Sequence, residues 1–375
     1  MTAGTYNSEQ LQDAQRQAAF KRIRQISGRM IAYGLMLFLG FVFLFPIIFM
    51  VVAAFKPNDR VIADLASIQA FLPDLSTLTL ANIEDVFDRV PFGQYSFNSL
   101  FLTLVTVITG LFINSMAAFT LSRLRWVGRT VVLSIIISLI IIPLEAIAVP
   151  LLMEVNQISG VMNIIVMLIL VTVNLLLWIA LWEGLDPLLS RLAFLQGGSS
   201  LIHNGIKAIL VFLISLPFEV LVYFIVQQTI DGGTWLDSFH VQIIPFIAEP
   251  FSIFLFYQFF IGIPKDFDEA AVVDGASTFR IYWQIIVPLS RPVFATVAIL
   301  KFLQFWSFYM WPLMVTRSET YRPLMVGMDF FQTQAPIRWG SIMAYAALVT
   351  VPVLIVFLLF QKWFVQSVSS SGVKG

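Results

Sequence analysis

Long apolar runs separated by short polar segments make up most of this chain. A membrane-spanning helix needs ~20 mostly apolar residues, and eight stretches meet that length: 31–54, 97–121, 130–153, 161–182, 206–229, 240–262, 291–313 and 341–364. Lipid offers backbone groups no hydrogen-bond partner, so such runs fold as helices. A transmembrane barrel would instead show short segments of alternating polarity. The pattern predicts an all-α membrane protein with about eight transmembrane helices.

Composition agrees with this fold class. The 375 residues are 59% hydrophobic and 12% charged, a balance that excludes a soluble globular protein. The formal net charge is zero, so nothing indicates nucleic-acid binding. The chain has no cysteine, and its two histidines, His203 and His240, lack the spacing of metal ligands. We therefore expect neither thiol chemistry nor a metal site.

The distribution of basic residues predicts the orientation in the membrane. Residues 1–29 are polar and end in a basic group, and the apolar run after them is too long for a signal-peptide core. With the N-terminus in the cytosol, inside segments hold fifteen of the 22 Lys and Arg residues and outside segments hold six. Lys301 remains within a span. The positive-inside rule therefore predicts cytosolic N- and C-termini.

The segment from Lys265 to Pro292 is the most informative polar stretch. Asp266 is placed to cap a helix that begins at Phe267, and Glu269 three residues later completes a capping-box-like pair. Four side chains then recur at helical spacing and would share one face: Val272, Ala276, Phe279 and Trp283. Gly275, mid-segment, indicates a turn or a close backbone approach. An ordinary amphipathic helix on the membrane surface is the alternative interpretation.

The same segment resembles the EAA loop of ABC importer permeases. The matching residues are Glu269, Ala270, Ala271, Asp274, Gly275, Ala276, Ile286, Pro288, Leu289 and Pro292. In that family the loop forms a short coupling helix that docks into a cleft on a cytosolic ATPase. The resemblance implies that the ATPase-coupling residues are Glu269, Ala270, Ala271, Asp274, Gly275, Ala276, Phe279 and Pro288.

Further segments are similar to the sugar-importer branch of these permeases, of the maltose permease G type. They are Phe97-Asn98-Ser99-Leu100, the basic loop Arg123 to Arg129, Pro143-Leu144-Glu145, Val149-Pro150-Leu151, Phe305-Trp306, Trp311-Pro312-Leu313 and the C-terminal Gly372 to Gly375. The resemblance covers residues 31–156 and 235–375. It implies an importer of a sugar or oligosaccharide in a bacterial or archaeal inner membrane, with another small polar solute as the alternative cargo.

The resemblance also implies the partners. These are a cytosolic ABC ATPase dimer that carries the ATP and Mg, a second permease subunit that is usually a different chain, and an extracytoplasmic solute-binding protein. No cofactor is expected on this chain. The acidic outside segment 55–96 would dock the binding protein or would simply be a solvated loop.

Four regions follow from this comparison. Residues 1–29 form a cytosolic tail, 30–156 the first part of the permease core with spans 1–3, and 235–375 the second part with the EAA-like loop at 264–292. Residues 157–234 depart from the family and form an inserted transmembrane hairpin. This hairpin is interpreted as peripheral, with a regulatory contact to the ATPase or to a further membrane subunit as the alternative. Glu219 in the hairpin has no assigned role.

Ionisable groups inside spans are rare and mark functional positions. Glu249 and Lys301 both lie near mid-depth of their predicted spans, so an ion pair between them is geometrically possible. The pair would serve either as a clamp between helices or as a polar grip on solute hydroxyl groups. The solute-path candidates are Glu249, Lys301, Gln304, Trp306, Ser307 and Tyr309, with Gln304, Ser307 and Trp311 on the helical face of Lys301. Interfacial anchoring is the alternative role for the Trp and Tyr residues.

Two other function classes compete with an importer subunit. A secondary transporter would use Glu249 and Lys301 as an ion relay and would show inverted repeats, which the span pattern lacks. A membrane-embedded enzyme would need a catalytic motif, and the chain contains no GxxxxGK[ST], HExxH or GxSxG sequence. We therefore expect a transport subunit whose ATP hydrolysis occurs on a separate chain.

Overall fold

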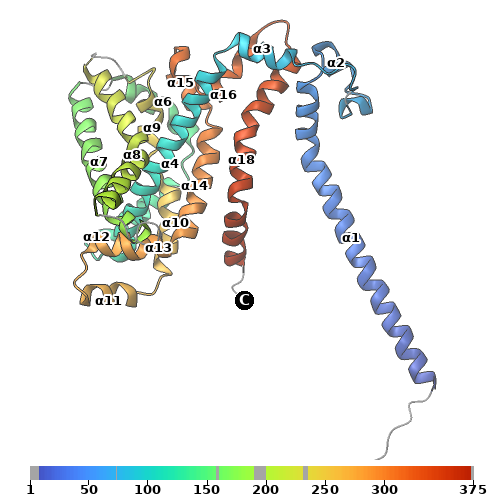
Figure 1. Cartoon of the computed structure of the whole chain (residues 1–375), viewed down its shortest axis with the longest axis horizontal. Helices are drawn as coiled ribbons and strands as arrows, with labels where there is room; N and C mark the ends of the chain where they lie inside the picture. Colours follow the sequence, from blue (N-terminus) through green and yellow to red (C-terminus); the bar gives the residue numbers. More distant parts are fainter. Residues whose placement is uncertain (1–7, 73, 158–159, 190–199, 231–234, 373–375) are drawn as a thin grey trace, which may run out of the picture. The chain divides into compact units, whose positions relative to one another are not determined.

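The computed structural model describes residues 8–72, 74–157, 160–189, 200–230 and 235–372, and every regular element within them is helical (Figure 1). The chain divides into two compact units. One unit comprises Met1–Val86 with Pro336–Leu348, and the other comprises Phe87–Ala335 with Val349–Gly375. The all-α expectation is thus confirmed for the described part of the chain.

The first unit contains α1 (Ser8–Ala54), α2 (Asn58–Ala63), the 3₁₀ turn η1 (Ile68–Ala70), most of α3 (Ala81–Arg89) and the start of α18 (Trp339–Gly372). The buried Asn82 amide donates to the carbonyl oxygens of Ala54 at 3.0 Å and Lys56 at 2.6 Å, which lie at the end of α1. Lys56 forms an ion pair with Asp64 at 2.9 Å. Part of the acidity predicted for segment 55–96 is therefore neutralised within the unit.

The second unit is built around α4 (Phe92–Arg123). Helices α10 (Pro250–Ile261) and α14 (Arg291–Trp306) both pack along it (Figure 1). Thr106, Thr109 and Ser115 lie on α4 and donate their hydroxyl protons to carbonyl oxygens four residues earlier. Such internal hydrogen bonds satisfy polar side chains where lipid cannot.

Helices α7 (Gly160–Leu189) and α8 (Ser200–Ile230) pack against each other, and α8 also contacts α4 and α9 (Phe239–Ile243). They occupy the region predicted as the inserted hairpin. Glu219 on α8 accepts hydrogen bonds at 2.9 Å from Trp178 Nε1 and from Ser215 Oγ. Leu177 and Val211 belong to the same buried cluster as Phe101 of α4. The hairpin therefore shares a core with the helices that flank it.

The remaining elements are short: α5 (Arg129–Leu139), α6 (Leu144–Gln157), η3 (Ile244–Phe246), α11 (Asp266–Val273), α12 (Thr278–Ile281), the π-helical η4 (Tyr282–Ile286), α13 (Val287–Leu289), α15 (Met310–Val315), η5 (Glu319–Tyr321), α16 (Leu324–Gly327) and α17 (Asp329–Thr333). Four helical segments in the described chain are long and apolar enough to span a membrane: Ser27–Ala54, Phe92–Arg123, Phe239–Ile261 and Trp339–Phe360. Two bent pairs raise this number to six. Shorter apolar stretches lie in α7 and α8, so helices occupy all eight predicted regions.

Three of the predicted spans are interrupted, contrary to the expectation of continuous helices. The run 130–153 breaks between α5 and α6, whose axes differ by 104°. The run 240–262 breaks between η3 and α10, and the run 291–313 breaks between α14 and α15. Each break lies at or within a few residues of a proline, at Pro143, Pro250 and Pro312 respectively. Proline lacks the N–H that would continue the helical ladder, and its ring clashes with the preceding turn.

Candidate functional site

The EAA-like loop (264–292) folds as α11 and a continuous helical stretch made of α12, η4 and α13, joined by a tight turn. Helix α11 ends in a Schellman motif, in which Gly275 N–H donates to Val272 O at 3.0 Å and Ala276 N–H donates to Ala271 O at 2.9 Å. Gly275 has φ +78°, a conformation that residues with a Cβ rarely adopt. The turn predicted at Gly275 is therefore confirmed. Figure 1 shows α11 as a separate rod below α12 and α13.

Two details of the predicted coupling helix are wrong. Lys265, and not Asp266, occupies the N-cap position, and no side chain caps the helix there. The helix also stops at Val273, so the four residues predicted on one face belong to different elements. Val272 is 62% exposed, whereas Ala276, Phe279 and Trp283 pack against a buried cluster. The sequence pattern did not predict the N-cap of α12, where Ser277 Oγ accepts a hydrogen bond from Arg280 N–H at 3.3 Å.

Arg123 at the end of α4 anchors the loop. Its Nη2 donates to the carbonyl oxygens of Phe260 at 2.7 Å and Ile263 at 2.8 Å, which lie at the C-terminal end of α10. Its Nη1 forms an ion pair with Asp268 of α11 at 3.0 Å, and the Arg123 side chain is only 4% exposed. One buried guanidinium thus satisfies helix-end carbonyls and a carboxylate together, so it ties three helices to one another.

The outward surface of α11 combines acidic and apolar side chains. Phe267, Val272 and Val273 are 48%, 62% and 88% exposed. Most of the predicted coupling residues share this exposure: Glu269, Ala270, Asp274, Gly275 and Pro288. Ala271 is buried, and Ala276 and Phe279 are partly buried against the cluster beneath the loop. The loop therefore has a packed inner side, and an outer side that is exposed in the described part of the chain.

The break between η3 and α10 is a second candidate region, separate from the EAA-like loop, where several polar groups meet. Pro245 and Pro250 cannot donate to the carbonyl oxygens of Val241 and Phe246, four residues earlier. The indole N–H of Trp311 donates to Val241 O at 2.8 Å, and Lys301 Nζ donates to Phe246 O at 3.3 Å. Side chains from neighbouring helices thus replace the donors that proline removes.

Asn114 of α4 completes the support of this break. Its Nδ2 donates to Ile247 O at 3.0 Å, and its Oδ1 accepts from the backbone N–H of Glu249 at 2.9 Å. Asn114 itself is fully buried. A single amide therefore fixes the position of Glu249 relative to the centre of α4.

The ion pair anticipated from the depths of Glu249 and Lys301 is present. Lys301 Nζ lies 3.1 Å from Glu249 Oε2, and the two side chains are 1% and 21% exposed. Ser252 Oγ also donates to Glu249 Oε2, at 2.5 Å. Gly110 of α4 makes room for the lysine, since a Cβ there would lie 2.7 Å from Lys301 Cε. The pair is thus built into the packing of α4, α10 and α14.

A cavity of about 570 Å³ adjoins the ion pair. It is bounded by the bend between α5 and α6, the break before α10 and the end of α14. Its lining residues are Leu139, Ile140, Ile142, Leu144, Ile147, Leu151, Pro245, Phe246, Ala248, Glu249, Pro250, Phe251, Gln304, Phe305 and Phe308. Glu249 is the one charged residue in this lining, and Gln304 supplies the other polar side chain. The cavity therefore combines aromatic walls with two polar groups.

The six predicted solute-path residues do not all reach this cavity. Trp306 is buried, donates its indole proton to Val349 O at 3.0 Å and stacks on Phe302. Ser307 Oγ donates to Leu303 O at 2.7 Å, and the Tyr309 hydroxyl donates to the Asp329 carboxylate. Trp311 does not share a helical face with Lys301, because α14 ends at Trp306. Glu249 and Gln304 line the cavity, and Lys301 lies behind Glu249.

Asp237 fixes the start of α9, which leads into the break. Its Oδ1 accepts hydrogen bonds from the backbone N–H groups of Arg317 at 2.9 Å and Ser318 at 3.0 Å. Burial disfavours the charged carboxylate, but the hydrogen bonds from Ser318 and Arg317 outweigh it and lower the pKa of Asp237 below its usual range. The carboxylate therefore joins the segment before α9 to the segment after α15.

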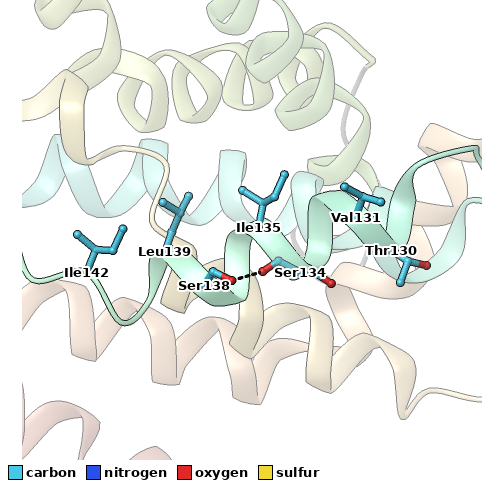
Figure 2. A pocket seen from close by; sticks show the side chains of 7 residues that line it. All are labelled: Thr130, Val131, Ser134, Ile135, Ser138, Leu139 and Ile142. Atoms are coloured by element: carbon cyan, nitrogen blue, oxygen red, sulfur yellow. Dashed lines mark hydrogen bonds between the residues drawn. The ribbon is translucent and has the colours of Figure 1, made fainter.

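A second, shallower cavity of about 380 Å³ runs along one side of α5 (Figure 2). Its lining is Thr130, Val131, Ser134, Ile135, Ser138, Leu139 and Ile142, and Ser138 Oγ donates to Ser134 O at 2.9 Å. No titratable side chain contributes to this lining. In the described residues searched, no group of His, Cys, Asp and Glu could hold a metal ion. Of these two cavities, the one beside Glu249 has a charged residue in its lining and the one along α5 does not.

Comparison with known proteins agrees with this architecture. Residues 191–370 match the family described as binding-protein-dependent transport system inner membrane component. The chain is 32% identical over 173 residues to the arabinooligosaccharides transport system permease protein AraQ of Bacillus subtilis, covering 46% of this chain and 61% of that relative. The AraQ protein of Halalkalibacterium halodurans is 24% identical over 339 residues, covering 90% of this chain and 94% of the relative.

One further relative and one solved structure are also similar to this chain. The trehalose/maltose transport system permease protein MalG of Thermococcus litoralis is 35% identical over 144 residues, 38% of this chain and 52% of the relative. The fold is similar to that in the crystal structure of a bacterial ABC transporter involved in the import of the acidic polysaccharide alginate, with a TM-score of 0.56, 20% identity, and coverage of 96% of this chain and all of that one. Over residues 191–370, a little under half of its length, the chain is therefore similar to inner membrane components of binding-protein-dependent transport systems, and the relatives named above are transport permease proteins.

Proposed function

We propose that this chain is the transmembrane permease subunit of an ATP-driven, binding-protein-dependent importer of a sugar or oligosaccharide. Relatives named for arabinooligosaccharide and for trehalose/maltose transport support this cargo class. The chain would cross a bacterial or archaeal inner membrane with eight helices and keep both termini in the cytosol. It would act with a second permease subunit and an extracytoplasmic solute-binding protein.

The EAA-like loop is the proposed contact for the cytosolic ATPase dimer, which carries the ATP and Mg. The observation that carries this proposal is the outer surface of α11, where Phe267, Val272 and Val273 are exposed beside acidic side chains. Exposed apolar side chains on a polar helix are typical of a surface that docks a partner. The packed inner side of the loop would transmit force, because it is anchored by Arg123.

Two helices connect the loop to the cavity. Helix α10 begins at Pro250, next to Glu249, and ends at the carbonyl groups that Arg123 holds. Its 12 residues span roughly 18 Å at ~1.5 Å per residue. Helix α4 runs alongside, with Asn114 at the break and Arg123 at the loop. Closure of the ATPase on ATP would move the loop, and α4 and α10 would carry that motion to the polar break.

Val273→Asp tests the coupling assignment. Val273 is 88% exposed, so the substitution leaves the folded chain intact but places a charge in the proposed dry contact. We expect the full-length chain, purified from its host in mild detergent, to retain its ATPase subunit, identified by mass spectrometry and by its Walker sequence. The Val273→Asp variant should lose that subunit and ATP-driven uptake, whereas Leu75→Asp, at another exposed apolar residue, should keep both. Full ATPase retention by Val273→Asp would contradict the proposal.

A further inference from the structure

We infer that the cavity beside Glu249 is a solute subsite for neutral, hydroxyl-rich molecules, and that the Glu249 carboxylate excludes anionic solutes from it. The inference rests on the proposed transport function and specifies the chemistry of its cargo. It concerns a cavity formed by this chain alone, between the α5–α6 bend, the break before α10 and the end of α14.

The ion pair presents its negative end to the cavity. Glu249 lines the cavity and its side chain is 21% exposed, whereas the Lys301 side chain is 1% exposed and lies behind it. Glu249 Oε2 already accepts from Lys301 and Ser252, while no hydrogen bond to Oε1 is present among the described residues. Oε1 is therefore the oxygen that can accept a proton from a solute hydroxyl group.

An anionic solute would meet no counter-charge in this cavity. The lining contains no Lys, Arg or His residue. Lys301, which pairs with the lining residue Glu249, is bound to Glu249 and to the Phe246 carbonyl oxygen. Because a buried charge without a partner is strongly unfavourable, the site disfavours an anionic solute relative to a neutral one.

The rest of the lining suits a ring that carries hydroxyl groups. Phe246, Phe251, Phe305 and Phe308 supply apolar faces, and the Gln304 amide offers both a donor and an acceptor. A few polar groups set in apolar walls are the usual composition of a small-molecule site. The cavity volume of about 570 Å³ lies within the range of such sites.

The absence of cysteine from the chain permits a direct test of the charge preference. Gln304→Cys introduces one thiol into the cavity lining of the full-length, detergent-purified complex. Its labelling rate is measured with a cationic reagent, methanethiosulfonate ethyltrimethylammonium, and an anionic one, methanethiosulfonate ethylsulfonate. Each rate is divided by the rate with free cysteine. We expect the cation-to-anion ratio to be about tenfold above unity, which corresponds to ~1.4 kcal/mol.

Companion variants assign the preference to the ion pair. Glu249→Gln should bring the ratio below unity, because Lys301 is then unpaired, and the double variant Glu249→Gln with Lys301→Met should return it to unity. If the single variant Glu249→Gln does not fold, the ratio measured in the double variant still tests whether the ion pair causes the preference. Glu219→Gln is the matched control: this carboxylate is bound to Trp178 and Ser215 on the hairpin, outside the cavity lining, and should leave the ratio unchanged.

Solute protection at a second position completes the experiment. With Phe308→Cys, arabinotriose or maltotriose at millimolar concentration should slow labelling several-fold, and sn-glycerol 3-phosphate should not. The inference is overturned by a ratio of unity in the parent, by a ratio that Glu249→Gln leaves unchanged, by protection from sn-glycerol 3-phosphate alone, or by failure of both thiols to label. Labelling requires no ATP, so loss of ATPase binding or uptake would overturn the proposed function without altering these ratios.

Discussion

The EAA-like loop and the polar break before α10 solve the same problem in opposite environments. Both interrupt helices and leave carbonyl groups without their usual donors. At the loop, Arg123 provides the donors, and the outer side of α11 stays exposed. At the break, Lys301, Trp311 and Asn114 provide them, and the polar groups stay buried. One interruption therefore leaves an exposed surface on α11, whereas the other borders a cavity.

The largest effect on stability is expected at the polar break before α10, where the charged groups are buried. Glu249→Gln leaves Lys301 charged and unpaired at 1% exposure, and we expect it to lower the free energy of unfolding by ~3–5 kcal/mol. Lys301→Met should be milder, because Glu249 reaches the cavity. The double variant should recover part of the loss. Unfolding free energies measured by steric trapping in bicelles test this cycle, and strictly additive losses would show that the pair is not coupled.

An intermediate effect is expected where the loop is anchored. Arg123→Gln removes an ion pair to Asp268 and leaves the Phe260 and Ile263 carbonyls without this donor. We expect a loss of ~2–4 kcal/mol in the free energy of unfolding, from charge-assisted hydrogen bonds, together with loss of uptake. The exposed Arg125 provides the control, and Arg125→Gln should change stability little. Equal losses of stability in Arg123→Gln and Arg125→Gln would show that Arg123 does not anchor the loop.

A smaller effect is expected at the turn of the loop. Gly275→Ala meets no neighbouring atom but must adopt φ +78°, so strain alone should cost ~1–2 kcal/mol. Gly93→Ala, inside α4 and equally free of neighbours, should instead stabilise the chain by ~0.5–1 kcal/mol. Thermal unfolding of the two variants in detergent should therefore shift in opposite directions. A shift in the same direction would show that the backbone conformation at Gly275 is not the determinant.

The two regions also differ in how far the sequence predicts them. The loop was identified from its charges and from the order of Glu269, Asp274 and Gly275, and the glycine turn followed from conformational preference. Its anchor could not be predicted, because Arg123 lies more than a hundred residues from Asp268 in sequence. Local pattern carries no information about such a contact.

The break illustrates a different limit. An apolar run of about 20 residues satisfies the length of a span whether or not it is continuous. Pro245, Pro250 and Pro312 were the available signals, since each removes a backbone donor. The positions of Glu249 and Lys301 near the middle of their predicted spans were enough to anticipate the ion pair. The position of a residue along a span does not define which way the helix is rotated. The burial of Trp306 and the separate orientation of Trp311 therefore became visible only in the folded chain.

We propose above all that the outer surface of α11 contacts the ATPase. A photoreactive phenylalanine analogue at position 273, in the full-length chain in native membranes, tests that claim most directly. The account predicts an ultraviolet-dependent adduct with the ATPase subunit, identified by mass spectrometry, whose yield changes when a non-hydrolysable ATP analogue is added. The same analogue at position 75 should give no such adduct. Absence of the ATPase adduct from position 273, in membranes where the chain and the ATPase co-purify, would contradict the account.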